Sequence, residues 1–191
     1  MIIQTGQRTD IPAFYSEWFA NRLRDGFVLV RNPFNPTAVT RYELNPGVVD
    51  LIGFCSKNPG PMLKFMDLLA PYHQYWFVTI TPYGEDIEPH VPGTVSVMDT
   101  FKKLSRIVGK DCIGWRYDPI IIDSEWTIER HIAAFSRMAA TLFGYTETCV
   151  ISFIDLYNKV KRNYPEVCDV PLADQLRLTE EFVKIAADYS M

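Results

Sequence analysis

The sequence has few residues in the spacings that bind a metal ion. Its four cysteines lie far apart and form no C-x-x-C pattern: Cys55, Cys112, Cys149 and Cys168. Its three histidines form neither H-x-H nor H-E-x-x-H: His73, His90 and His131. Because such sites depend on closely spaced ligands, we expect neither a metal site built from these cysteines alone nor a hydrolytic zinc barrel.

Other functional signatures are also missing. There is no G-x-G-x-x-G after a strand-like run, no G-x-x-x-x-G-K-[ST] and no G-x-S-x-G, so dinucleotide binding, P-loop hydrolysis and α/β-hydrolase chemistry lack support. No apolar run approaches the ~20 residues that span a bilayer, and residues 1–5 lack a signal pattern, so we expect a cytoplasmic protein. The formal net charge of -4 gives no overall attraction for nucleic acid or an anionic membrane.

What the sequence does contain is an alternation of strand-like and helix-like segments. Short apolar runs at residues 2–3, 27–30, 48–54, 75–80, 112–115 and 149–154 predict strands. Helical patterns cover residues 12–25, 61–69, 94–108, 127–143 and 171–187, with a short helical turn within 156–164. Their apolar stripes, such as Phe14, Trp18, Phe19 and Leu23, indicate core packing.

This alternation predicts one α/β domain over residues 1–191. Strands separated by helices pair in parallel through crossovers, and about six βα units fit an incomplete TIM-type barrel, with an open doubly wound sheet as the alternative. Because the chain stops after a helix, where another strand would be due, we expect it to be a fragment of a longer protein.

Polar residues follow every predicted strand, often just before a proline. Since proline cannot continue a central strand, each polar side chain is expected at the carboxyl rim of the sheet, where ligands bind in parallel α/β folds. The predicted anion-binding residues at this rim are Arg8, Arg31, Asn32, Lys57, Asn58, Thr81, Tyr83, Arg116 and Tyr117. The predicted proton-handling or orienting residues are Asp10, Asp118 and Asp155.

A structural alternative exists for several of these residues. Asp10 stands just before a predicted helix and could cap it, while Asn32 and Asn58 could form Asx turns. In the functional interpretation, four cations at one rim, Arg8, Arg31, Lys57 and Arg116, need acids or an anionic ligand beside them, because like charges repel.

The strand-end motifs together resemble one protein family. The segments are 8–15 (RTDIPAFY), 31–36 (RNPFNP), 57–59 (KNP), 81–84 (TPYG), 86–89 (DIEP) and 115–120 (WRYDPI). They are similar to the bacterial domain of unknown function 1848, over residues 2 to about 155. The resemblance implies a C-terminal cysteine cluster in full-length members, like that of radical S-adenosylmethionine enzymes, and hence a [4Fe–4S] cluster and S-adenosylmethionine in the whole protein; this chain lacks that cysteine cluster.

Three functions stay open from the sequence. The first is the barrel portion of a radical-S-adenosylmethionine-like iron–sulfur enzyme that holds an anionic substrate or cofactor at its rim. The second is a barrel enzyme without such a cluster that acts on a phosphorylated small molecule, with the three aspartates as Mg²⁺ ligands in one version. The third is a non-enzymatic nucleic-acid-binding module, which the negative net charge disfavours. The expected partner is a small anionic ligand, and no membrane is expected.

Overall fold

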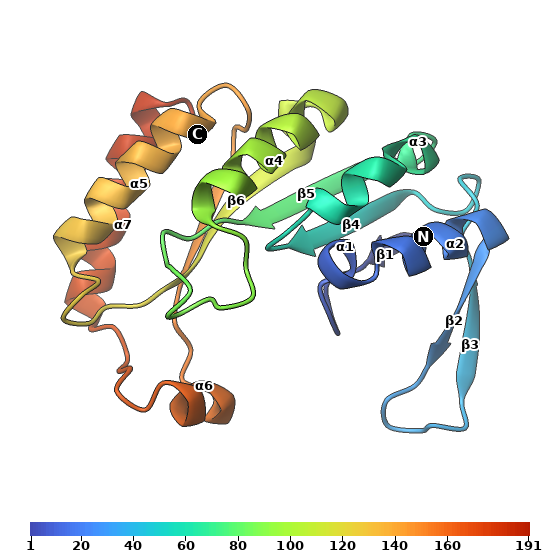
Figure 1. Cartoon of the computed structure of the whole chain (residues 1–191), viewed down its shortest axis with the longest axis horizontal. Coiled ribbons are helices and arrows are strands. Elements are labelled where there is room, and N and C mark those ends of the chain that lie inside the picture. The colour runs from blue at the N-terminus through green and yellow to red at the C-terminus, as the bar shows by residue number, and fades with distance from the viewer. The chain divides into compact units, whose positions relative to one another are not determined.

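The computed structural model describes all residues, 1–191, as two compact units (Figure 1). Unit 1 comprises Met1–Val78 and unit 2 comprises Thr79–Met191. Each unit contains parallel strands followed by helices.

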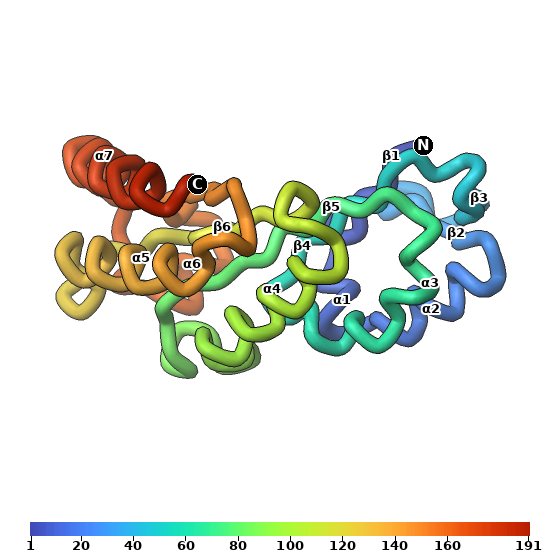
Figure 2. Tube along the Cα trace, turned by 90° about the horizontal axis from the view of Figure 1, so that it is seen from above, coloured from blue at the N-terminus to red at the C-terminus, as the bar shows by residue number.

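Unit 1 is built on three parallel strands, β1 (Ile2–Gln4), β4 (Leu51–Ser56) and β5 (Gln74–Thr79). Thr79, the last residue of β5, is the first residue of unit 2. Helices α1 (Ile11–Phe14) and α2 (Ser16–Asp25), the 3-10 turn η1 (Gly60–Phe65) and α3 (Met66–Leu69) lie along one face of these strands (Figure 2). The core under them contains Phe54 stacked on Trp76, with ring centroids 3.9 Å apart, and Phe19 edge-on to Phe54 at 5.9 Å. Burial of these aromatic rings supplies much of the unit's hydrophobic stabilisation.

The apolar stripe predicted for residues 12–25 is only half buried. Phe19 and Leu23 are in the core, whereas Phe14 and Trp18 are exposed. The helix is interrupted at Tyr15, which separates α1 from α2. Phe14 lies before the break, in α1, and Trp18 lies outside the buried face of α2, so the prediction that they are core residues is wrong.

The second predicted strand is not part of the parallel sheet. β2 (Phe27–Arg31) pairs antiparallel with β3 (Val39–Glu43), and this hairpin extends beyond the helices of its unit (Figure 1). The connection of residues 32–38 is a turn: the Asn32 carboxamide oxygen accepts the Phe34 N–H at 2.9 Å and the Asn35 N–H at 3.3 Å. A parallel crossover needs a dozen or more residues, so this short turn permits only a hairpin, and the prediction of a parallel strand at Phe27 is wrong.

Unit 2 contains β6 (Ile113–Ile120) and β7 (Cys149–Phe153), which are parallel. Its other elements are α4 (Thr94–Val108), η2 (Lys110–Cys112), α5 (Ile128–Leu142), α6 (Asn158–Asn163) and α7 (Leu172–Asp188). α5 and α7 lie side by side (Figures 1 and 2), and Phe135 of α5 stacks on Phe182 of α7 with ring centroids 4.0 Å apart. Phe135 also stacks on Trp115 of β6 at 4.8 Å, which joins both helices to the strand.

The fold class predicted from the sequence is confirmed as α/β. The parallel strands follow the order β1-β4-β5-β6-β7, and within unit 2 the Ile80 N–H that follows β5 donates to the Arg116 carbonyl of β6 at 2.9 Å. β1 and β7 are the edges, so the sheet is open and forms no closed barrel. The number of parallel strands is five, because the second predicted strand belongs to the hairpin.

One predicted strand end is also wrong. β6 does not stop at Asp118 but continues through Pro119 to Ile120. The pairing with β7 shifts between Tyr117 and Ile120, and such an irregularity accommodates a residue that has no N–H to donate. No helix in the structure combines the length and the apolar character needed to cross a membrane.

We expect the stack of Phe135 and Phe182 to be a main source of stability in unit 2. Phe182→Ala should lower the free energy of unfolding by about 3–5 kcal/mol, because it removes a buried ring and leaves a cavity. Urea denaturation followed by circular dichroism measures this change. The neighbouring Val183 is 63% exposed, so Val183→Ala is the matched control and should stay within about 0.5 kcal/mol of the unsubstituted protein.

Candidate functional site

A pocket of about 530 Å³ lies inside unit 1. It is lined by the segment that follows β1, by the junction of α1 and α2, and by β2. We call it the arginine pocket, after the two charged residues in its lining, Arg8 and Arg31. Small-molecule sites in proteins fall in this range of volume and are mostly apolar with a few polar groups, as this one is.

The two arginines of the pocket are linked to each other. The Arg8 guanidinium donates to the backbone carbonyl of Arg31 at 3.1 Å, which ties the segment after β1 to the hairpin. A guanidinium carries five N–H donors, so this one bond leaves Arg8 with further donors. The lining contains no aspartate or glutamate. The charged residues of the lining are therefore both basic, which suits an anion.

Gln4 is a further polar group in the lining. Its side chain lies across the backbone of Gly53, where a Cβ atom would come within 2.3 Å of the Gln4 Oε1. Glycine at position 53 leaves room for the Gln4 carboxamide in this position.

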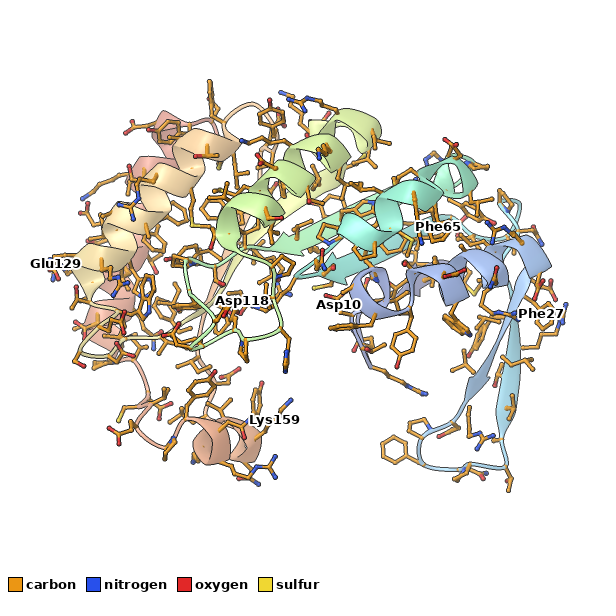
Figure 3. The ribbon with its side chains drawn as sticks, viewed as in Figure 1. Asp10, Phe27, Phe65, Asp118, Glu129 and Lys159 are labelled. Carbon is orange, nitrogen blue, oxygen red and sulfur yellow. The ribbon has the colours of Figure 1, made fainter.

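Asp10 is placed at the start of α1 (Figure 3). One carboxylate oxygen accepts the Ala13 N–H at 2.9 Å, as an N-cap does, and the other accepts the Lys57 N–H at 2.8 Å. Nearby, the Asn58 N–H donates to the Ser56 hydroxyl at 2.9 Å and the Asn58 carboxamide oxygen accepts the Gly60 N–H at 3.3 Å. With the turn at Asn32, these are the capping and turn contacts that the sequence offered as the structural alternative.

In unit 2, Arg116 and Asp118 lie two residues apart on β6, so they share one face of the strand. Asp118 forms an ion pair with Arg116 and accepts a hydrogen bond from the Ser152 hydroxyl of β7. These three side chains form one polar network on the face of β6 opposite to Trp115 and Tyr117, which are buried.

Tyr83 and Tyr117 are both buried and hydrogen-bonded within unit 2. The Tyr83 hydroxyl donates to the Pro119 carbonyl at 2.8 Å and accepts the Ile121 N–H at 2.9 Å. Burial raises the pKa of both phenols well above the ordinary value of 10, so they stay protonated at neutral pH. Neither hydroxyl is at the surface of the unit.

His131 is the partner of Tyr117. Its Nδ1 is 2.7 Å from the Tyr117 hydroxyl and its Nε2 is 2.8 Å from the Ile121 carbonyl oxygen. A carbonyl only accepts, so Nε2 carries the proton and donates, while Nδ1 accepts from the phenol. Burial lowers the pKa of His131, which keeps this imidazole neutral.

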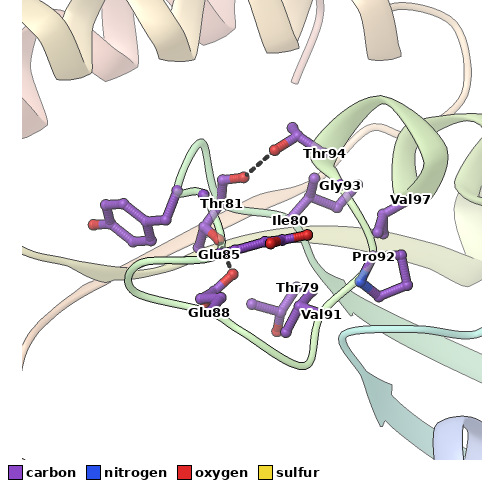
Figure 4. A pocket seen from close by; sticks show the side chains of 12 residues that line it. Thr79, Ile80, Thr81, Glu85, Glu88, Val91, Pro92, Gly93, Thr94 and Val97 are labelled. Atoms are coloured by element: carbon purple, nitrogen blue, oxygen red, sulfur yellow. Dashed lines mark hydrogen bonds between the residues drawn. The ribbon is translucent and has the colours of Figure 1, made fainter. Parts of the chain in front are cut away.

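A second, smaller cavity of about 100 Å³ lies beside the start of α4 (Figure 4). Its lining includes Glu85 and Glu88 and no lysine or arginine. The Thr81 hydroxyl, predicted to bind an anion, donates to Glu88 at 2.6 Å, and the Thr94 hydroxyl donates to the Thr81 carbonyl at 2.9 Å. The charged residues of this lining are both acidic, so the cavity does not suit an anionic ligand.

Asp155 follows β7 and is exposed. Its carboxylate accepts a hydrogen bond from the Tyr157 hydroxyl at 3.0 Å. This contact raises the pKa of Tyr157, because the carboxylate stabilises the protonated phenol.

The residues of this chain do not fit an iron–sulfur cluster. All four cysteines are free, and nowhere do three or more histidine, cysteine, aspartate or glutamate side chains come together to hold a metal ion. Burial raises the pKa of the Cys149 thiol, which opposes the thiolate that a cluster requires.

The predicted site residues fall into both units. Unit 1 holds Arg8, Arg31 and Lys57, and it brings Arg8 and Arg31 together in the arginine pocket. Unit 2 brings Arg116 and Asp118 together. That all of these residues lie together at one carboxyl rim of the sheet stays a prediction. Sequence reasoning missed Gln4, Tyr15 and Trp18 of the pocket, although Tyr15 closes the motif of residues 8–15.

Comparison with known proteins gives the family. The family described as Domain of unknown function (DUF1848) matches residues 2–191, so the chain belongs to this family, and the match extends past residue 155 to the end of the chain. Searches of curated proteins and of solved structures found no match.

We expect the buried His131 to make stability depend on pH. Its pKa is lowered from the ordinary value of 6.5, so the unfolded chain binds a proton that the folded chain does not. The free energy of unfolding should hold its full value above pH 6.5 and fall as the pH drops through that value towards the lowered pKa of the folded state. Urea denaturation at pH 7.5 and pH 5.5 measures the difference.

His131→Gln is the comparison for this experiment, because glutamine does not titrate. The loss of stability between the two pH values should be smaller in His131→Gln than in the unsubstituted protein. An equal loss in both would mean that other groups cause the pH dependence.

Proposed function

We propose that this protein binds a small organic anion in the arginine pocket of unit 1. The observation that carries the proposal is the lining itself, which includes two arginine residues and no acidic residue around a space of about 530 Å³. A pocket of this size and charge favours a ligand with a carboxylate or phosphate group.

The chemistry of arginine supports this choice of ligand. A guanidinium is always charged and presents its donors in a planar fork that matches carboxylate and phosphate oxygens. Two such groups in one pocket repel each other, so an anion that contacts both relieves this repulsion and gains charge-assisted hydrogen bonds.

The proposal also bears on the finer functions considered from the sequence. A substrate or cofactor of an iron–sulfur enzyme and a phosphorylated metabolite would each present such an anionic group. The residues of this chain do not fit a [4Fe–4S] cluster, and the binding of an anion by the two arginines does not depend on one.

Replacing either arginine of the pocket should weaken anion binding. With methyl phosphate as the probe, Arg31→Gln should raise Kd about tenfold or more, because one charge-assisted hydrogen bond to an ion contributes about 1.5–3 kcal/mol. The Arg31 carbonyl that holds Arg8 is backbone and is unchanged by this substitution. Arg8→Gln should have an effect of similar size. Isothermal titration calorimetry, or chemical-shift titration if binding is weak, measures both.

Arg24→Gln is the matched control, because it removes the same charge from unit 1 at an exposed position of α2 outside the pocket lining. It should change Kd less than twofold. An equal loss in all three variants would indicate a general charge effect and contradict a site in the arginine pocket.

A further inference from the structure

We infer that the ligand of the arginine pocket carries a flat ring, which stacks on Trp18 and Tyr15 while Arg8 and Arg31 hold its anionic group. This inference rests on the proposed function and specifies the class of ligand, an aromatic phosphate or carboxylate. The observations that support it concern apolar residues of the lining, which would not contact the anionic group.

The first observation is that two large aromatic side chains of the pocket are exposed. Trp18 is 44% and Tyr15 is 50% exposed, and both belong to the pocket lining. Tyr15 is the N-terminal cap of α2 and Trp18 lies in its first turn, so one short segment places both aromatic residues in the lining. Exposed aromatic surface inside a pocket is typical of a ligand-binding wall.

The second observation is an aliphatic wall on a different element. Val28, Leu29 and Val30 of β2 also line the pocket, and Leu29 is 58% exposed. Side chains alternate along a strand, so Val28 and Val30 share one face of β2 and Leu29 lies on the other. The pocket thus combines aromatic residues at the start of α2 with aliphatic residues of β2. A ring bound there would remove apolar surface of both elements from water.

The third observation is that the core of unit 1 supports the aromatic wall. The Trp18 ring lies against the buried Phe19, with centroids 6.5 Å apart, and Phe19 contacts Phe54 in the core. The Phe19 N–H donates to the Tyr15 carbonyl at 2.9 Å, which fixes the backbone between the two aromatic residues. Because these side chains are already held in place, less conformational entropy is lost when a ligand binds.

The charged end of the pocket complements this wall. Arg8 and Arg31 belong to the same lining as Trp18 and Tyr15, and Arg8 is tied to β2 by its bond to the Arg31 carbonyl. A ligand with a ring at one end and an anionic group at the other would contact both sets of side chains at once.

The test compares two probes of equal charge, phenyl phosphate and methyl phosphate, by isothermal titration calorimetry on the full chain. The unsubstituted protein should bind phenyl phosphate about tenfold more tightly, because only this probe has a ring to stack and to bury. In Trp18→Ala this advantage should fall to twofold or less, while the Kd of methyl phosphate stays within twofold. Trp18→Phe, which keeps a ring, should retain most of the advantage.

Phe14→Ala is the matched control. Phe14 is an aromatic residue at the end of α1, 67% exposed and outside the pocket lining. Its removal should leave the Kd of both probes unchanged. If the aromatic surface instead served a protein partner, Phe14 and Trp18 would be equivalent for these small probes, and equal effects of the two substitutions would overturn the inference.

A parallel pair, benzoate and acetate, distinguishes the two anionic groups. Tighter binding of benzoate than of phenyl phosphate would assign a carboxylate, and the reverse a phosphate, and either result supports a ring-bearing anion. Equal affinity for probes with and without a ring would overturn the inference and leave the proposed function standing. If none of the four probes binds, the proposed function itself fails.

Discussion

The carboxylate of Asp10 is the contact on which the arrangement of unit 1 depends. Its two oxygens accept the N–H groups of Ala13 and Lys57, so a single side chain joins the start of α1 to the residue that follows β4. The segment that carries Arg8 precedes Asp10, and Tyr15, between α1 and α2, and Trp18, in α2, follow it. Asp10 therefore fixes the junction between the segment of Arg8 and the segment of Tyr15 and Trp18, with a contribution to helix stability of about 1 kcal/mol from the capping bond.

The parts of the fold that could be predicted are those with strong local patterns. α4 and α5 have continuous apolar stripes and end at or next to a glycine, and their observed bounds lie within a residue or so of the expected ones. The hairpin could not be predicted in the same way. An apolar run such as Phe27–Val30 marks a strand but not its partner, and β3 is exposed along its whole length, so it lacks the alternation that marks a half-buried strand.

The candidate site was predictable only in its charges. Arg8 and Arg31 follow apolar runs, and this pattern predicts that they bind an anion. Trp18 carries no such signal, because in the sequence it belongs to a helical stripe that also contains the buried Phe19 and Leu23. Trp18 lies beside the buried Phe19 in the unbroken helix α2, about 100° further round the helix, at the edge of the buried face. Periodicity alone does not show whether a residue at that edge faces the core or a pocket.

The position of Asp10 also explains how a pocket with two arginines can lack a carboxylate in a chain whose net charge is -4. Asp10 lies two residues from Arg8 in the sequence, close enough to form an ion pair if its side chain turned towards the pocket. Both of its oxygens instead accept backbone N–H groups, and the residue is absent from the pocket lining. A carboxylate that paired with Arg8 would compete with an anionic ligand for the same donors. By holding Asp10 at the start of α1, the fold keeps its carboxylate out of the lining of the arginine pocket, as the proposed binding of an anion requires.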